Sequence, residues 1–451
     1  MPHRALFTDL YQLTMVAGHL AANRHSRRAT FELFLRRLPS ERAFVIAAGL
    51  DTALDYILSL RFTDDEIEWL RTVPALSHAP AGFFDYLGRL RFTGDVWALP
   101  EGTPFFPQEP VLRVSAPLAE AQMLETTLLA IVNFQTSIAS KAARLVAAAR
   151  STPVMEFGAR RAHGPDAALY AARAAYLGGC ESTSLVEAGR RFGIPLAGTM
   201  AHSWILASSS ESQAFSEYMD VFEEHSVLLL DTYDTLDAAH AIVAAGLRPP
   251  AVRLDSGDVL ALSRSTRRIL DDGGLQSTRI LASGDLNEHR IRALVAERAP
   301  IDGFAVGTAL TTSEDAPALG GVYKLVQIED ADGTRDVMKR SAGKATWPGR
   351  KQVYRITDQG TAIRDVIAFE DEPIDGRPLL EQVVARGERM LAPPSLPEVR
   401  ARARRAIGEL PSHLLQLDPS PAYDVAPSPR VADAIRPNQS SVPPVDTNST
   451  G

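Results

Sequence analysis

Short apolar runs that each end in a small polar cluster constrain the fold of this chain more than any other feature. From about residue 150 they recur roughly every 25–40 residues, and a helical pattern follows each of them. Continuous apolar runs are typical of buried parallel strands, and this spacing fits a strand, a helix and their loops. The pattern predicts a β/α barrel or a doubly wound sheet, in which ligands bind at the carboxyl ends of the strands. The runs end in PVMEFG (153–158), IPLAGT (194–199), VLLLDTYDT (227–235), AVRLDSGD (251–258), RILASGD (279–285) and DGFAVGT (302–308).

The segments on either side of this repeat have a mixed pattern. Thr63 to Glu66 has the form of a capping box at the start of a helix. The tail from about residue 418 is rich in Pro, Ser, Asp and Asn and is expected to be disordered. We expect helices over 1–23, 47–60, 64–72 and 396–409, a buried helix or helix pair over 118–149, and strands over 31–39, 92–114, 320–328 and 351–369.

Composition narrows the class of protein. The chain is 45% hydrophobic and 23% charged, as expected of a globular protein, and we expect neither a membrane span nor a secretory signal. The single cysteine, Cys180, precludes an internal disulfide and fits the cytoplasmic location that we expect. The net charge of −8 argues against a nucleic-acid partner.

Two Ser-Gly-Asp turns follow successive apolar runs. Acidic side chains there can bind a ribose diol or Mg²⁺, a glycine lets the backbone approach a ligand, and the next helix offers free N–H groups to a phosphate. Each turn alone is better explained as a helix cap, but the pair indicates a shared sugar-phosphate site. The candidate residues are Arg253, Asp255, Ser256 and Gly257 in the first turn, and Gly284 and Asp285 in the second.

Further candidates lie at other run-ends or on the first helix. Arg160, in EFGARR, can hold a carboxylate or phosphate in bidentate geometry, although such a residue is more often part of a surface ion pair. His202 can act as a base or phosphate acceptor, and no neighbouring residue has the spacing of a zinc site. Gly307 and Thr308 can donate to a phosphate, whereas Tyr11 on sequence alone is best explained as a core aromatic.

Eight segments, in order, resemble the nicotinate phosphoribosyltransferase family. They span residues 8 to about 326, and PGRKQVYR (348–355) is similar as well. One position departs from the family, because Leu185 in CESTSLV stands where an Asn is usual, so Thr183 and Ser184 are left out of the expected site. The segments are TDLYQLTM (8–15), FELFLRRLP (31–39), EFGARRAHGPDAAL (156–169), AGTMAHSWI (197–205), DTYDTL (231–236), RLDSGD (253–258), ASGDL (282–286) and GFAVGTALTTSEDAPALGGVYKLV (303–326).

The resemblance implies a fold and a domain order. The fold is α/β, with an irregular β/α barrel of the type II phosphoribosyltransferase kind packed against an N-terminal α+β domain that also takes in C-terminal strands. The implied parts are an N-terminal domain (1–140), the barrel (141–330), a C-terminal segment that returns to the N-terminal domain (331–415), and a disordered tail (416–451).

The resemblance also implies a reaction, in which nicotinate and phosphoribosyl pyrophosphate give nicotinate mononucleotide and pyrophosphate for NAD synthesis. ATP hydrolysis is coupled to it through a phosphorylated histidine, His202, with Mg²⁺ present. Phe157 and Tyr11 would cover the two faces of the pyridine ring, with Tyr11 supplied by the partner subunit of a homodimer that shares its active sites. Arg160 would pair with the nicotinate carboxylate. Ribose and phosphate groups would be held by Arg253, Asp255 and Asp285, and the 5′-phosphate by Gly284, Gly307 and Thr308.

Other interpretations stay open at this point. A sister enzyme could use nicotinamide, which lacks the charge that Arg160 would meet, or quinolinate, whose second carboxylate demands further cations. A non-catalytic nucleotide-binding regulator would show loss of His202, Arg160 or Asp255, which are all present. An aldolase- or isomerase-type barrel would need a metal cluster or a Schiff-base lysine, and Lys324 is the only lysine among these strand segments.

Overall fold

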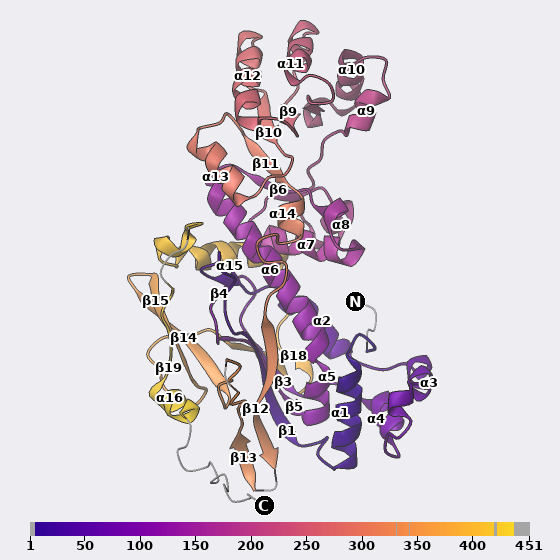
Figure 1. Ribbon diagram of the computed structural model, residues 1–451, viewed down its shortest axis with the longest axis vertical. Helices are drawn as coiled ribbons and strands as arrows, with labels where there is room; N and C mark the ends of the chain where they lie inside the picture. Colours follow the sequence, from indigo (N-terminus) through magenta and orange to yellow (C-terminus); the bar gives the residue numbers. More distant parts are fainter. Residues whose placement is uncertain (1–4, 331, 342, 419–421, 437–451) are drawn as a thin grey trace, which may run out of the picture.

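A computed structural model of the protein describes residues 5–330, 332–341, 343–418 and 422–436. It is elongated, with a parallel-sheet barrel at one end and a mostly antiparallel sheet domain at the other (Figure 1). The predicted fold class is confirmed, including the entry of C-terminal strands into the N-terminal sheet. Among the described residues, no helix combines the length and the apolar character needed to cross a membrane.

The N-terminal domain is built on a seven-stranded sheet of order β13-β12-β1-β5-β3-β17-β18, whose pairings are antiparallel. Helix α3 begins with the predicted capping box of Thr63 and Glu66. The strands are β1 (Arg28–Leu35), β3 (Asp95–Ala98), β5 (Pro110–Pro117), β12 (Gly321–Asp330), β13 (Gly333–Asp336), β17 (Glu381–Ala385) and β18 (Glu388–Arg389), with β2 (Val45–Ile46) and β4 (Pro104–Phe105) paired separately. The helices are α1 (Leu10–Ala21), α2 (Leu50–Ser59), α3 (Asp64–Arg71), α4 (Phe83–Arg89), α5 (Leu118–Met123) and the 3-10 turn η1 (Pro74–Leu76).

The barrel is a curled parallel sheet of order β7-β6-β11-β10-β9-β8. It is irregular because the predicted strand at 194–199 is wrong: Leu196 makes only an isolated bridge to Thr183, and Pro195 has no N–H with which to extend the ladder. The strands are β6 (Val154–Glu156), β7 (Ser182–Thr183), β8 (Val227–Leu229), β9 (Ala251–Leu254), β10 (Arg279–Ala282) and β11 (Gly303–Val306). The helices are α6 (Glu125–Ala149), α7 (Pro165–Leu177), α8 (Val186–Phe192), α9 (His202–Leu206), α10 (Glu211–Phe222), α11 (Thr235–Ala244), α12 (Val259–Asp272), α13 (Glu288–Ala296) and α14 (Thr308–Thr311), with the turns η2 (Ala159–Arg161) and η3 (Glu223–His225).

The chain returns to the N-terminal domain at β12, so this return begins at residue 321 rather than at 331. A further sheet of order β16-β14-β15-β19 lies beside that domain (Figure 1). Its strands are β14 (Lys351–Asp358), β15 (Thr361–Phe369), β16 (Arg377–Pro378) and β19 (Val425–Pro427), accompanied by α15 (Leu396–Gly408), η4 (Ser412–Leu415) and α16 (Pro429–Ile435).

The expected disorder over 416–451 is wrong for residues 422–436. Strand β19 pairs with β15, Tyr423 stacks on Phe106 at 4.0 Å, and Val431 is fully buried. A few apolar side chains that dock on an existing sheet edge are sufficient to order a segment whose average composition is polar. Residues 419–421 and 437–451 lie outside the described residues.

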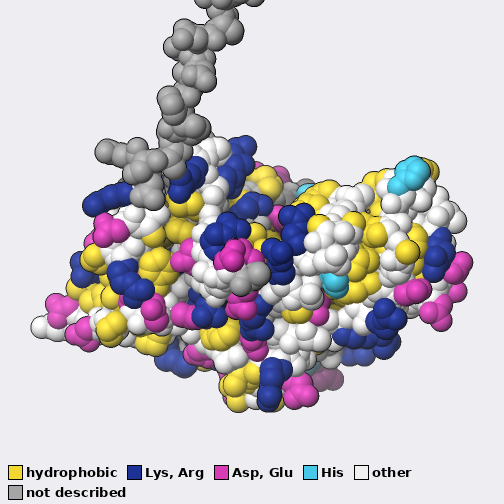
Figure 2. All heavy atoms as spheres, turned by 90° about the horizontal axis from the view of Figure 1, so that it is seen from below, with side chains coloured by type: hydrophobic (Ala, Val, Ile, Leu, Met, Phe, Trp, Pro, Cys, Tyr) yellow, Lys and Arg dark blue, Asp and Glu magenta, His cyan; other side chains and the backbone are white. Residues whose placement is uncertain are grey.

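The long helix α6 joins the two parts of the molecule and is buried along most of its length. It contacts α2 and β2 in the N-terminal domain and α7 and α13 in the barrel. At the same junction Arg42 forms a bidentate ion pair with Asp315, with nitrogen–oxygen distances of 2.8 and 2.9 Å. On the face seen in Figure 2, described Lys and Arg side chains lie interspersed with Asp and Glu.

Candidate active site

Parallel pairing brings the polar run-ends to a single edge of the barrel sheet. In register, Leu229 lies opposite Arg253, Leu254 opposite Ala282, and Val306 opposite Glu156. The loops that follow β8, β9, β10, β11 and β6 therefore emerge side by side, as the sequence pattern predicts.

Arg253 is the organising side chain of this edge. It is buried at the end of β9, and its guanidinium donates to Asp255 at 2.5 Å, to Ser283 at 2.7 Å and to Thr199 at 2.7 Å. Ser283 in turn donates to Asp255. The guanidinium also lies 5.9 Å from the centre of the Phe157 ring, so one cation connects four loops.

His202, Asp231 and Asp255 converge beside this arginine. Nε2 of His202 lies 4.0 Å from Asp255, while Nδ1 lies 3.1 Å from the Thr232 hydroxyl. One potential ligand atom from each of the three residues lies within 4.8 Å of the other two. Burial tends to raise the pKa of Asp255, but hydrogen bonds from Ser283 and Arg253 together with the nearby His202 hold that pKa below its usual value. Asp255 is therefore a carboxylate at neutral pH.

The second Ser-Gly-Asp turn packs directly against the first. A Cβ atom at Gly284 would lie 1.7 Å from the carbonyl oxygen of Asp255, and this glycine has a φ of +77°. Asp285 follows with a φ of +43°, an uncommon conformation for a residue with a side chain. Only glycine fits at 284, and the tight turn presents Asp285 to solvent at the mouth of the site.

Phe157 and Arg160 form the side of the site that follows β6. The Phe157 N–H donates to Val306 at 2.9 Å, which fixes the turn beside Gly307. Arg160 lies on η2, exposed, and among the described residues it has no carboxylate partner. Thr308 begins α14 and is also exposed, and the first N–H groups of that helix have no acceptor within the helix.

Tyr11 is the one predicted residue that the structure does not bring to this centre within a single chain. It lies on α1, which contacts α5 in the N-terminal domain, at the other end of the molecule from the loops after β8 to β10 (Figure 1). It is 45% exposed, so it is not the core aromatic that the sequence alone suggested. With Leu10 and Met15 it forms an exposed apolar stripe on α1, and the exposed Leu6 and Phe7 lie in the turn that precedes this helix.

Two family models match the chain. Residues 6–133 match the nicotinate phosphoribosyltransferase N-terminal domain, and residues 138–316 match the quinolinate phosphoribosyl transferase C-terminal domain. Nicotinate phosphoribosyltransferase pncB2 of Mycobacterium tuberculosis is 45% identical over 439 residues, which cover 96% of this chain and 93% of that protein. The chain belongs to the nicotinate phosphoribosyltransferase family.

Another relative and two solved structures are similar to this chain over most of its length. The nicotinate phosphoribosyltransferase of Bacillus subtilis is 43% identical over 382 residues, covering 82% of this chain and 77% of that protein. The crystal structure of human nicotinic acid phosphoribosyltransferase superposes with a TM-score of 0.82 at 30% identity, covering 94% of this chain and 98% of the human one. A nicotinate-nucleotide pyrophosphorylase from Pyrococcus furiosus superposes with a TM-score of 0.73 at 26% identity, covering 90% and 95%.

Membership in the nicotinate phosphoribosyltransferase family decides between the classes of protein that the sequence left open. The chain is an enzyme of pyridine-nucleotide synthesis, so neither a non-catalytic regulator nor an aldolase-type barrel describes it. The barrel alone would not separate nicotinate from quinolinate enzymes, because its matching model is named for the latter. The N-terminal domain and the full-length relatives make that distinction.

The structure brings further residues to this centre that the sequence pattern does not predict. Asp231 and Thr199 were not among the expected site residues, although both lie in segments that resemble the nicotinate phosphoribosyltransferase family. Glu156 ends β6 and accepts hydrogen bonds from Thr183 and from the N–H of Gly158. Burial raises the pKa of Glu156, while these two bonds oppose the rise. A signal for Asp231 was available, since it directly follows an apolar run, as Asp255 does.

Leu185 departs from the family without disturbing its own turn. It forms the N-cap position of α8, and its N–H donates to Thr183 at 3.0 Å. The Thr183 hydroxyl thus accepts a hydrogen bond from the backbone N–H of Leu185 and donates one to Glu156. Both bonds stabilise the loop after β7 inside the protein.

Proposed function

We propose that this centre transfers the phosphoribosyl group of phosphoribosyl pyrophosphate to nicotinate, with release of pyrophosphate, and couples the transfer to ATP hydrolysis. The supporting observation is the arrangement of Arg253, Asp255, Asp231 and His202 around one point. Phe157 and Arg160, which has no ion-pair partner in the described part of the chain, lie alongside. A charged, hydrogen-bonding side for the ribose, the phosphates and their metal ion thus lies next to an aromatic and cationic side for a flat acid.

Arg160 favours nicotinate over nicotinamide as the substrate. Its guanidinium has no carboxylate partner among the described residues, so it is available for bidentate pairing with the substrate carboxylate. Phe157 would cover one face of the pyridine ring. The pyridine nitrogen is itself a nucleophile, so orientation of the ring toward the anomeric carbon replaces a general base.

Asp231 and Asp255 fit the requirements of a Mg²⁺ ion. Carboxylate oxygens are the ligands that Mg²⁺ prefers, and Oδ1 of Asp231 is buried without a hydrogen-bond partner among the described residues. When bound, Mg²⁺ would neutralise charge on the departing pyrophosphate. The side chains themselves are already oriented, since Ser256 donates to Asp231 and Arg253 holds Asp255.

In this proposal His202 would accept a phosphoryl group from ATP. A proton on Nδ1, donated to Thr232, would leave the lone pair of Nε2 free and facing Asp255. Nε2 would take the terminal phosphoryl group and ADP would leave, and water would later release inorganic phosphate. The phosphorylated ring would carry additional negative charge, by analogy with other phosphorylated side chains, into the space between Asp231 and Asp255.

The remaining phosphate contacts would come from backbone groups. Gly284, Gly307 and Thr308 are proposed to hold the 5′-phosphate, with free N–H groups at the start of α14 and a glycine that lets the ligand approach. Arg253, Ser256, Gly257 and Asp285 would contact ribose and phosphate groups from the two turns.

A homodimer with shared sites would complete the nicotinate pocket. The exposed apolar stripe on α1 is a surface that a second copy of the chain would cover, and Tyr11 lies within it. Tyr11→Ala and His202→Ala should each lose ATP-stimulated mononucleotide formation, and mixing them should restore it, because each mixed dimer then contains one intact site. Failure of restoration after verified subunit exchange would contradict shared sites.

The purified enzyme with phosphoribosyl pyrophosphate tests the reaction itself. Nicotinate, nicotinamide and quinolinate are supplied separately, with and without ATP, and mononucleotide formation is measured. We expect turnover with nicotinate, an increase on adding ATP, and loss of nicotinate selectivity in Arg160→Gln. Equal turnover of nicotinamide by the wild type would overturn the role of Arg160.

A further inference from the structure

A cavity of about 730 Å³ lies on the opposite edge of the barrel from the proposed catalytic centre. It is bounded by α6, α7, α15 and residues 414–417. Arg150 and Ser151 line it and precede β6, and Glu181 lines it and precedes β7, so it adjoins the amino ends of these strands. The catalytic loops leave the carboxyl ends, and the two sites are therefore separate.

Three arginines line this cavity without an ion-pair partner among the described residues: Arg150, Arg400 and Arg404. Arg400 donates to the Gly179 carbonyl at 2.9 Å and lies 4.9 Å from the centre of the Tyr176 ring, but its Nε is buried without a hydrogen-bond partner. Two other lining arginines are already neutralised: Arg42 pairs with Asp315, and Arg144 pairs with Glu288. The one acidic residue in the lining, Glu181, is exposed.

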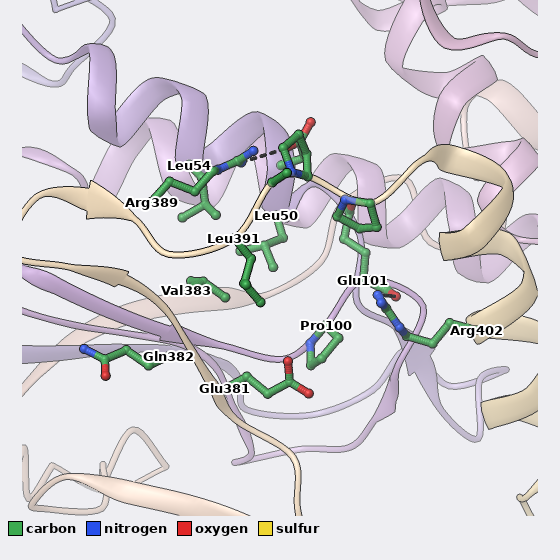
Figure 3. A pocket seen from close by; sticks show the side chains of 14 residues that line it. Leu50, Leu54, Pro100, Glu101, Glu381, Gln382, Val383, Arg389, Leu391 and Arg402 are labelled. Atoms are coloured by element: carbon green, nitrogen blue, oxygen red, sulfur yellow. Dashed lines mark hydrogen bonds and ion pairs between the residues drawn. The ribbon is translucent and has the colours of Figure 1, made fainter.

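A smaller cavity of about 200 Å³ shows the contrasting case (Figure 3). There Arg389 pairs with Asp51 at 2.6 Å, and Arg402 donates to the carbonyl of Glu101 at 3.2 Å. The basic groups of the small cavity are thus satisfied by the protein itself. In the large cavity Arg150, Arg400 and Arg404 have no ion-pair partner among the described residues. Arg400 and Arg404 also stand one helical turn apart on α15, where like charges repel.

We propose that the large cavity binds a small molecule that carries a diphosphate group on an apolar body. Three guanidinium forks provide bidentate donors and a charge that a diphosphate neutralises better than a single carboxylate. Apolar side chains from both walls, including Val146, Leu177, Ile407 and Leu415, suit a flat or aliphatic body. The volume lies in the range of about 300–1,000 Å³ that is usual for ligand pockets.

Binding is tested with three probes: ADP, inorganic pyrophosphate and adenosine. Isothermal titration calorimetry is performed on the full chain and on the double variant Arg150→Gln/Arg404→Gln, which keeps the contact between Arg400 and Gly179. Arg405→Gln is the control for the change at Arg404, because it removes one charge from the neighbouring position of the same helix, outside the cavity lining. We expect two classes of ADP site in the wild type and in the control. In the double variant, one class should weaken by more than about tenfold.

The catalytic centre provides the internal reference. His202→Ala should retain the class of ADP site that the double variant loses. The double variant should in turn retain mononucleotide formation. Failure of this proposal is therefore distinguishable from failure of the proposed reaction. Binding of pyrophosphate as well as ADP would show that the diphosphate suffices, and ADP alone would show that the apolar body contributes. Adenosine binding as tightly as ADP, unchanged ADP binding in the double variant, or crystals with ADP that show no density in this cavity would overturn the proposal.

Discussion

The two sheets at the N-terminal end of the molecule and the strand ends of the barrel use charged residues in opposite ways. Glu32 of the N-terminal sheet pairs with Lys351 of the neighbouring sheet at 2.8 Å, Arg355 pairs with Asp365 within that neighbouring sheet at 2.6 Å, and all four side chains are buried. At the barrel edge Asp255 remains partly exposed and Arg160 is unpaired among the described residues. Charges that are fully enclosed and paired hold the fold, whereas charges that are oriented but left open are available to a ligand.

The largest expected effect is on stability and comes from the sheet. Glu32→Ala leaves the Lys351 ammonium buried without its carboxylate, and burial already lowers the pKa of that lysine. We expect a loss of about 3–5 kcal/mol in the free energy of unfolding, measured by denaturant titration. Activity per folded molecule should be unchanged. The double variant Glu32→Leu/Lys351→Met should recover much of the lost free energy of unfolding. If it does not, the Glu32–Lys351 pair stabilises the fold by more than mutual neutralisation of its two charges.

The converse experiment is at the barrel edge. Asp255→Asn keeps the shape of the side chain but removes its charge, so turnover should fall by about 10²–10³-fold while the unfolding transition shifts little. Asp272→Asn, the same change at the exposed end of α12, should alter neither. A large loss of stability in Asp255→Asn would place this residue with the structural charges and erase the distinction between the two regions.

The junction between the two regions should respond to acid. Burial tends to raise the pKa of Asp315, but Arg42 and Lys141 lower it to about 2 from an ordinary value of 3.8. Asp315 therefore contributes stability that is present above about pH 4 and is lost as the pH falls toward 2, by about 2 kcal/mol. The free energy of unfolding should change less over this pH range in Asp315→Asn than in the wild type. An equally steep decline in the variant would assign the acid sensitivity to other groups.

The smallest effect is expected at the outer helices of the barrel. Burial together with Asp234 and Asp237 raises the pKa of Glu211 to about 7. Because the unfolded chain ionises this residue first, its contribution to stability decreases as the pH rises from about 4.5 to 7. Glu211→Gln should therefore lose less thermal stability than the wild type between pH 5 and pH 8. A parallel decline in both proteins would remove Glu211 as the cause.

The difference between the regions also explains what the sequence could predict. The Ser-Gly-Asp turns and Arg253 were identified because parallel strands place every run-end at one edge. The strand at 194–199 was wrong because one proline ends its pairing, and Asp231 was missed because its run-end lacks a glycine. The order of residues 422–436 depends on docking of Tyr423 and Val431 against distant elements, which composition does not record.

The account is tested most directly at His202. The enzyme is incubated with ATP and Mg²⁺, digested under alkaline conditions and analysed by mass spectrometry, and the ATP consumed per mononucleotide formed is measured in the wild type and in His202→Ala. We predict an acid-labile phosphate on His202 and loss of ATP consumption in the variant. An unphosphorylated His202, or the same ATP consumption per product in His202→Ala, would contradict the proposed coupling at the barrel edge.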